Sequence, residues 1–66
     1  MKATINGRAH ELPGELTVAA LLELLGSPTS GVAVARNDRV VRHSEYSSDV
    51  VREGDRLEII QAVAGG

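Results

Sequence analysis

The absence of cysteine from a chain of only 66 residues is the feature that most restricts what this sequence can fold into. A domain of this size buries only about 60% of the surface of its unfolded chain, and many natural domains this small add disulfides or a metal. Without cysteine, disulfides, thiolate metal ligands and a cysteine nucleophile are all excluded. We therefore expect one small domain, residues 1–66, that is stabilised by its hydrophobic core and has no deep cleft of its own.

That core has to be aliphatic, because the sequence has no Phe or Trp and only one aromatic residue, Tyr46. The net charge is −2 and the seven Lys and Arg residues form no run, so no nucleic-acid-binding surface is expected. The longest unbroken apolar stretch, residues 18–22, is too short to span a membrane, and the first residues have no signal-peptide pattern. These features indicate a cytoplasmic protein that binds neither nucleic acid nor membranes.

The start of the chain predicts a hairpin. Residues 2–5 alternate between apolar and polar side chains in the strand period. Asn6-Gly7 follows, and this dipeptide is typical of a two-residue type I′ turn, which requires a positive φ at both positions. Residues 8–12 then form the predicted return strand.

An amphipathic helix is predicted over residues 18–25. Thr17 can cap its N-terminus, and Gly26 stands where a left-handed C-terminal cap is expected. Such a helix could bind a partner, but so small a domain needs the apolar face for its own core, so we expect it to pack on the sheet. That face consists of Val18, Leu21, Leu22 and Leu25.

The second half of the chain contains further short strands. Residues 32–35, 39–41 and 57–61 are rich in Val, Ile or Leu and are separated by turn residues and by a polar segment at 43–49. A hairpin, a helix and then short strands indicate the α+β class. The expected architecture is a roll in which one main helix packs across a mixed sheet of four or five strands, with the last strand beside the first.

Nothing in the interior of the sequence indicates an active site. His10 and His43 lie on different elements, and no carboxylate is spaced around either of them for metal binding. The sequence has neither a Gly-x-Ser-x-Gly motif nor a Gly-rich phosphate loop. We therefore expect no catalytic residue, no bound metal and no bound cofactor, and the chain is not predicted to be an enzyme.

The end of the sequence points to another kind of chemistry. Residues 62–66 have side chains that shrink toward the last position, and two final glycines occur by chance in only about 0.5% of chains. A flexible tail of this kind can enter a narrow channel in another protein and present its α-carboxylate, because glycine has no Cβ and adopts any φ. Two alternative interpretations of the final glycines are a frayed chain end without a function and residues left over from genetic engineering. In order, the tail residues are Ala62, Val63, Ala64, Gly65 and Gly66.

Three segments of the sequence resemble a known family. They are Ile5-Asn6-Gly7 with Glu11-Leu12-Pro13, the helical segment 16–22, and the end of the chain, 53–66. Together they resemble the ThiS family of sulfur carriers, which are ubiquitin-like β-grasp proteins. The likeness spans nearly the whole chain and is weakest over residues 39–48. It implies a ubiquitin-like β-grasp roll that acts as a single sulfur carrier domain.

The resemblance also implies that the chain is a substrate of other enzymes. A ThiF-like adenylating enzyme would use ATP to activate the carboxylate of Gly66, and a desulfurase system would supply the sulfur that converts it to a thiocarboxylate. A ThiG-like thiazole synthase would take that sulfur for the thiazole ring of thiamine. Two alternatives stay open: a carrier for another product, such as molybdopterin or an amino acid, and a ubiquitin-like interaction module whose tail is never activated.

The last strand offers a candidate partner surface. If Leu57 and Ile59 face the core, alternation along the strand turns Glu58 and Ile60 outward. An exposed isoleucine beside a reactive tail is a candidate docking point for the adenylating enzyme. A scattered surface residue is the alternative, because single exposed apolar side chains are common.

Overall fold

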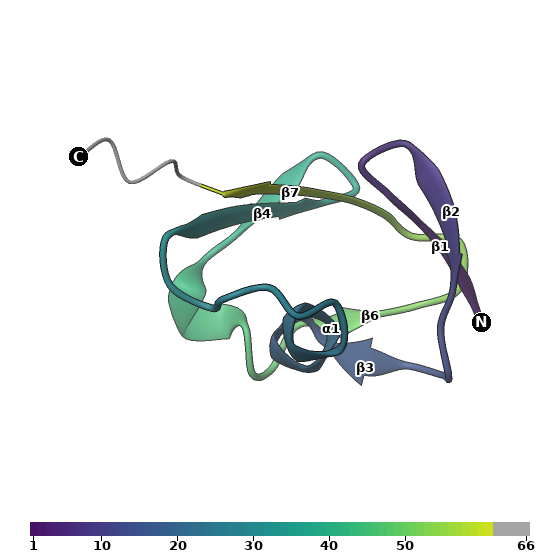
Figure 1. Cartoon of the computed structure of the whole chain (residues 1–66), viewed down its shortest axis with the longest axis horizontal. Coiled ribbons are helices and arrows are strands. Elements are labelled where there is room, and N and C mark those ends of the chain that lie inside the picture. The colour runs from purple at the N-terminus through teal and green to yellow at the C-terminus, as the bar shows by residue number, and fades with distance from the viewer. Residues whose placement is uncertain (62–66) are drawn as a thin grey trace.

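The computed structural model describes residues 1–61, which form a mixed five-stranded sheet with a helix packed against one face (Figure 1). The predicted tail, residues 62–66, lies outside the described residues. In chain order the elements are β1 Lys2–Ile5, β2 Arg8–Glu11, β3 Leu16–Thr17, α1 Val18–Leu24, β4 Val32–Arg36, β5 Arg39–Val41, the 3-10 turn His43–Glu45, β6 Val50–Val51 and β7 Arg56–Gln61. The strand order is β2-β1-β7-β4-β5, and a separate two-stranded pair joins β3 to β6.

The first hairpin forms as its turn chemistry predicts. Asn6 and Gly7 have φ values of 51° and 81°, the two positive angles that a type I′ turn needs. β1 and β2 pair antiparallel, with Ile5 opposite Arg8 next to the turn. The return strand ends at Glu11, one residue earlier than predicted, and the following residue, Leu12, is buried in the core.

The last strand occupies the centre of the sheet. β7 runs parallel to β1, with Ile5 opposite Leu57, and antiparallel to β4, with Val34 opposite Ile59. This placement confirms the prediction that the last strand inserts beside the first. β7 is also the element from which residues 62–66 continue, and at its last residue, Gln61, it pairs with Val32 of β4.

Helix α1 begins where predicted and is capped as predicted. The Thr17 hydroxyl accepts a hydrogen bond from the backbone N–H of Ala20 at 3.1 Å, which satisfies one of the free donors of the first turn. At the other end, Gly26 has a φ of 71°, and its N–H donates to the carbonyl of Glu23 at 3.0 Å. The N–H of Ser27 reaches the carbonyl of Leu22 at 2.8 Å, which completes a Schellman cap.

The prediction of which residues form the buried face of the helix is wrong at one residue, Leu25. Val18, Leu21 and Leu22 are completely buried, but Leu25 is exposed. The helix ends at Leu24, so Leu25 lies in the capping turn, where the chain already turns away from the sheet. The early stop at the glycine cap shortens the buried stripe to three residues.

The short pair of β3 and β6 has no counterpart in the sequence prediction, and Tyr46, which was predicted to pack over a loop, is buried in the core instead. β3 and β6 form an antiparallel pair of two residues each, with Leu16 opposite Val51, and this is too short to show a strand period. Tyr46 follows the 3-10 turn and is buried in the core, where its hydroxyl donates to the carbonyl of Val32 at 3.3 Å. The single aromatic side chain therefore ties the polar segment to the start of β4.

The core lies between the sheet and the helix and is almost entirely aliphatic, as the composition requires. Within residues 1–61, no helix has the length and apolar character needed to cross a membrane. The buried apolar residues are Ala3, Ile5, Leu12, Val18, Leu21, Leu22, Val34, Val41, Tyr46, Val51 and Leu57.

Candidate functional site

The most connected polar group of the described residues is centred on Arg36, at the end of β4. Its guanidinium donates to both oxygens of Asp49, from Nε at 2.9 Å and from Nη2 at 2.8 Å, and from Nη1 to Asp55 at 3.3 Å. Asp55 is buried and accepts further hydrogen bonds from the side chain of Asn37 at 3.0 Å and from the N–H of Arg52 at 2.8 Å. This Arg36 network joins β4, the loop before β6 and the residue before β7.

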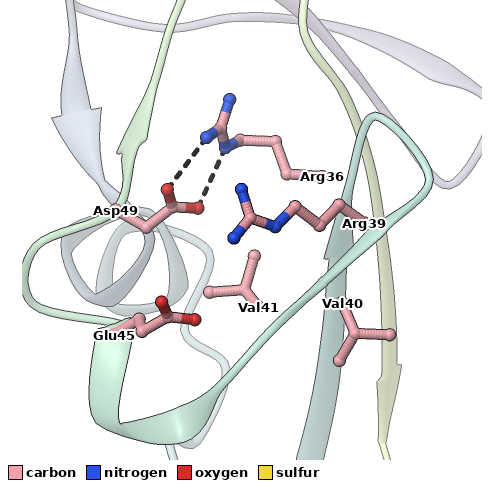
Figure 2. A pocket seen from close by; sticks show the side chains of 6 residues that line it. All are labelled: Arg36, Arg39, Val40, Val41, Glu45 and Asp49. Atoms are coloured by element: carbon pink, nitrogen blue, oxygen red, sulfur yellow. Dashed lines mark hydrogen bonds and ion pairs between the residues drawn. The ribbon is translucent and has the colours of Figure 1, made fainter.

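The Arg36 network borders a surface hollow of about 50 Å³, shown in Figure 2. Arg36 and Arg39 extend from the β4–β5 hairpin toward Asp49 and Glu45, so two positive and two negative side chains line the same small space (Figure 2). Their charges cancel, and Arg36 is already occupied by two carboxylates. The hollow is therefore part of the scaffold and has no excess charge with which to attract an ionic ligand.

The network lowers the pKa of both carboxyls. The hydrogen bonds from Arg36 hold the pKa of Asp49 below its ordinary value, against a smaller opposite effect of burial. Burial is the largest single effect on Asp55 and raises its pKa, but the hydrogen bonds from Asn37 and Arg52, with the charge of Arg36, outweigh it, and the pKa is lowered. Both groups therefore stay ionised to a lower pH in the folded protein than in the unfolded chain.

Acid is expected to destabilise the protein through Asp49 and Asp55. Their ionised forms stabilise the fold fully above the unfolded pKa of about 3.9, and this contribution is lost as the pH falls through the lower folded values. The free energy of unfolding, measured with urea at a series of pH values, should therefore fall mainly below about pH 4. Arg36→Met should lower that free energy by about 1–3 kcal/mol at neutral pH and flatten its acid dependence.

Arg39→Met is the matched control, because Arg39 lines the same hollow and is not a donor to Asp49 in the network. It should change the free energy of unfolding by less than about 0.5 kcal/mol. An acid dependence that is as steep in Arg36→Met as in the parent would contradict this assignment of the acid-sensitive groups.

The candidate partner residue, Ile60, lies where alternation predicts. Leu57 is completely buried and Ile59 is half-buried, whereas Glu58 is exposed and Ile60 is 64% exposed. The side chain of Ile60 therefore points away from the core, on the face of the sheet opposite the helix. Its role as a partner surface stays a prediction.

Ile60 is part of a larger apolar surface, which we call the outer-face patch. Cross-strand pairing puts Ile60 opposite Ala33 and puts Val40, which is 72% exposed, opposite Ala35. With Glu58 at its border, the patch surrounds a shallow hollow of about 160 Å³. The outer-face patch consists of Ala33, Ala35, Val40 and Ile60.

Sequence reasoning missed Val40, although a signal for it was present. In the short strand Arg39-Val40-Val41, burial of Val41 requires Val40 to face outward. What no local pattern could provide is the pairing of β4 with both β5 and β7, which brings Val40 and Ile60 onto one face. The other predicted site residues, Ala62, Val63, Ala64, Gly65 and Gly66, lie outside the described residues.

Comparison with known proteins places the sequence in a family. The model of the ThiS family matches residues 3–66, which is nearly the whole chain. The chain belongs to the ThiS family. A sulfur carrier protein ThiS from Escherichia coli is 32% identical over 66 residues, and the match covers all of both proteins. This ThiS-family membership confirms the resemblance that the sequence segments indicated.

The fold is confirmed by a solved structure of a family member. The crystal structure of the thiamine biosynthesis protein ThiS from Geobacter metallireducens matches this chain with a TM-score of 0.86 and 29% identity, over the full length of both. The mixed sheet of five strands with one helix across it is therefore the ubiquitin-like β-grasp fold, as predicted.

A third relative is a much longer protein. The thiazole synthase of Paramagnetospirillum magneticum is 42% identical to this chain over 66 residues, but the chain spans only 20% of its length. That enzyme therefore contains a ThiS-like segment within a much longer sequence.

Proposed function

We propose that this ThiS-family chain is a sulfur carrier of thiamine biosynthesis and that the carboxylate of Gly66 is its reacting group. The observation that carries the proposal is the extent of the family match, which runs to residue 66 and so includes Gly65 and Gly66. The full-length similarity to a protein named as a sulfur carrier supports it. In this function the chain is a substrate, and the catalytic groups and the ATP belong to its partners.

The proposed chemistry has three steps. A ThiF-like enzyme joins the Gly66 carboxylate to the α-phosphate of ATP, which forms an acyl-adenylate and releases pyrophosphate. The terminal sulfur of a persulfide, supplied by a desulfurase system, attacks the acyl carbon and displaces AMP. A second thiol then reduces the resulting acyl disulfide. The transferred sulfur stays on the carrier as a thiocarboxylate, and the sulfur that remains on the donor forms a new disulfide with the second thiol.

A thiazole synthase is the proposed acceptor of the sulfur. A ThiS-like segment occurs within the chain of the Paramagnetospirillum magneticum thiazole synthase, and this supports the view that carrier and synthase act together. It favours thiazole formation over molybdopterin or an amino acid as the product. The thiocarboxylate sulfur would form a bond to the synthase's substrate, and water would then cleave the carrier's acyl carbon–sulfur bond, which leaves the sulfur on the substrate and returns the carrier to its carboxylate form.

The fold suits this function because the last strand, from which the short reactive segment continues, is part of the central sheet. β7 is paired with β1 and β4 and ends at Gln61, so residues 62–66 remain between the sheet and the reacting carboxylate. Five residues span at most about 16–18 Å. A partner enzyme therefore has to bring its active site close to the sheet, and it has to contact surfaces near the end of β7.

The outer-face patch is the surface that we expect the adenylating enzyme to contact. Ile60→Asp should weaken binding to that enzyme by about ten- to one-hundredfold, because it puts a charge into the apolar centre of the contact. The melting temperature should change little, because Ile60 is 64% exposed and is not one of the buried core residues. Titration calorimetry with the purified adenylating enzyme measures the binding, and thermal unfolding measures the stability.

Arg8→Gln provides the control for the charge change, because it also lowers the net charge by one, and because Arg8 is also exposed but lies on the outer strand β2, away from the patch. It should leave the affinity within about threefold of the parent. Equal losses in the two variants would show that net charge, rather than the patch, decides binding.

The proposed function is tested by reconstitution. The purified chain is mixed with a ThiF-like enzyme and ATP, and exchange of labelled pyrophosphate into ATP is measured. Exchange that depends on the chain is expected. Absence of exchange would favour the interaction-module alternative. When a persulfide donor is added, transfer of the sulfur to a thiazole synthase rather than to a molybdopterin-forming enzyme then identifies the product.

A further inference from the structure

The support of β7 changes along its length. On the β1 side, the regular ladder ends with Ile5 opposite Leu57, and the last backbone bond runs from the N–H of Asn6 to the carbonyl of Leu57 at 2.9 Å. On the β4 side, pairing continues to Gln61, opposite Val32. The second half of β7 would therefore be held by strand pairing on one side only, and it is this half that leads into residues 62–66.

The side chain of Asn6 makes the hydrogen bonds to β7 that the backbone of β1 does not make at this point. Its Oδ1 accepts from the N–H of Ile59 at 2.8 Å, and its Nδ2 donates to the carbonyl of the same residue at 3.1 Å. A carboxamide has the donor and acceptor of a peptide group, so these two bonds continue the β1–β7 ladder by one more step. The tip of the β1–β2 hairpin accordingly lies beside β7 in Figure 1.

Few residue types can make both hydrogen bonds to Ile59 from the first position of the β1–β2 turn. Asn6 is the first residue of the type I′ turn and has a φ of 51°, which Gly, Asn and Asp tolerate best. Gly has no side chain to reach β7, and ionised Asp has an acceptor but no donor. Among the residues that suit the turn, asparagine is the one that can make both bonds to Ile59.

We propose that Asn6 is a positioning residue that fixes the direction in which β7 leaves the sheet and so aims the reactive end of the chain at the adenylating enzyme. This inference rests on the proposed function. By holding the strand end in one direction before binding, Asn6 reduces the conformational freedom that docking has to remove. Its loss should therefore raise the KM for the carrier and leave kcat nearly unchanged, because the partner holds the end of the chain once it is bound.

The chain contains a matched control at the other end of the same strand. Asn37 is the first residue of the β4–β5 turn and has a φ of 54°. Its Oδ1 accepts from the N–H of Arg56 at 2.9 Å and its Nδ2 donates to buried Asp55 at 3.0 Å. Asn37→Gly therefore removes two hydrogen bonds and keeps a turn-compatible residue, as Asn6→Gly does, but it acts where β7 begins.

Amide hydrogen exchange shows first whether the contact exists in solution. In Asn6→Gly, exchange of the Ile59 amide should accelerate by a few-fold to about tenfold, which is the range that one net hydrogen bond supplies. Asn6→Asp keeps the acceptor and should fall between Asn6→Gly and the parent. In Asn37→Gly, the Arg56 amide should accelerate instead, and the Ile59 amide should not.

Pyrophosphate exchange at varied carrier concentration then tests the consequence. Asn6→Gly should raise the KM for the carrier by about five- to tenfold with less than a twofold change in kcat, whereas Asn37→Gly should change both by less than about twofold. An unchanged Ile59 amide or an unchanged KM in Asn6→Gly would overturn the inference, as would an equal rise in Asn37→Gly. A parent protein that is not adenylated at all would overturn the proposed function itself.

Discussion

Deletion of Gly66 is expected to reduce the rate of adenylation by at least about one hundredfold. The deletion withdraws the reacting carboxylate by about 3.3–3.6 Å, and a misplacement of about 1 Å can already cost a hundredfold when geometry controls a reaction. An alanine added after Gly66 should have an effect of similar size, because it moves the carboxylate past the phosphate and adds a Cβ. Pyrophosphate exchange with the ThiF-like enzyme measures both variants.

The matched control changes the length of the chain without changing the tail. A glycine inserted between Thr29 and Ser30 lengthens the exposed connection before β4 and leaves residues 57–66 as they are. This insertion should preserve the rate within about threefold, since surface connections tolerate added residues. All three variants should melt close to the parent. A Gly66 deletion that is adenylated at nearly the parental rate would contradict the role of the terminal carboxylate.

Leu57→Ala is expected to have the largest effect on stability. Leu57 is completely buried on the central strand, and such a truncation costs about 2–5 kcal/mol through lost burial and the cavity that it leaves. The whole domain has a stability of only about 3–10 kcal/mol if it follows the usual value per residue. The variant should therefore be substantially unfolded at 37 °C, as circular dichroism and urea unfolding would show.

Ile60→Ala is the control on the same strand. It removes an aliphatic side chain three residues later, but one that is 64% exposed, so the cost should be below about 0.5 kcal/mol. Similar losses in Leu57→Ala and Ile60→Ala would contradict the register of β7, because a shift of one residue exchanges the buried and exposed faces.

The sequence predicts best those features that local chemistry decides. Asn6-Gly7 specifies its turn because few residues tolerate two positive φ angles, and Thr17 and Gly26 mark the ends of the helix because each satisfies free backbone groups. Alternation along β7 likewise places Ile60 outside. These predictions need only the residue types and the spacing within one element.

Features that depend on distant parts of the chain could not be predicted in this way. Arg36 meets Asp49 across 13 positions and Asp55 across 19, and no local pattern pairs an arginine with either carboxylate. The side chain of Asn6 bonds to Ile59 across 53 positions, although its turn was recognised from the sequence. The exposure of Leu25 also escaped prediction, because the helical period continues through a residue that the glycine cap turns away from the core.

The central claim, that the carboxylate of Gly66 becomes a thiocarboxylate, is tested most directly by mass spectrometry of the protein purified from its native cells. Replacement of an oxygen by sulfur adds about 16 Da, which is also the nominal gain of a sulfoxide at Met1, so the modified site has to be located. Trypsin cleaves after Arg56, the last basic residue, and releases peptide 57–66, which contains no methionine. We predict a gain of about 16 Da in this peptide. Treatment with an alkylating reagent, which converts the thiocarboxylate to a thioester, should replace this form by a heavier one that carries the alkyl group. An unmodified peptide in cells starved of thiamine, or a chain that continues beyond Gly66, would contradict the claim.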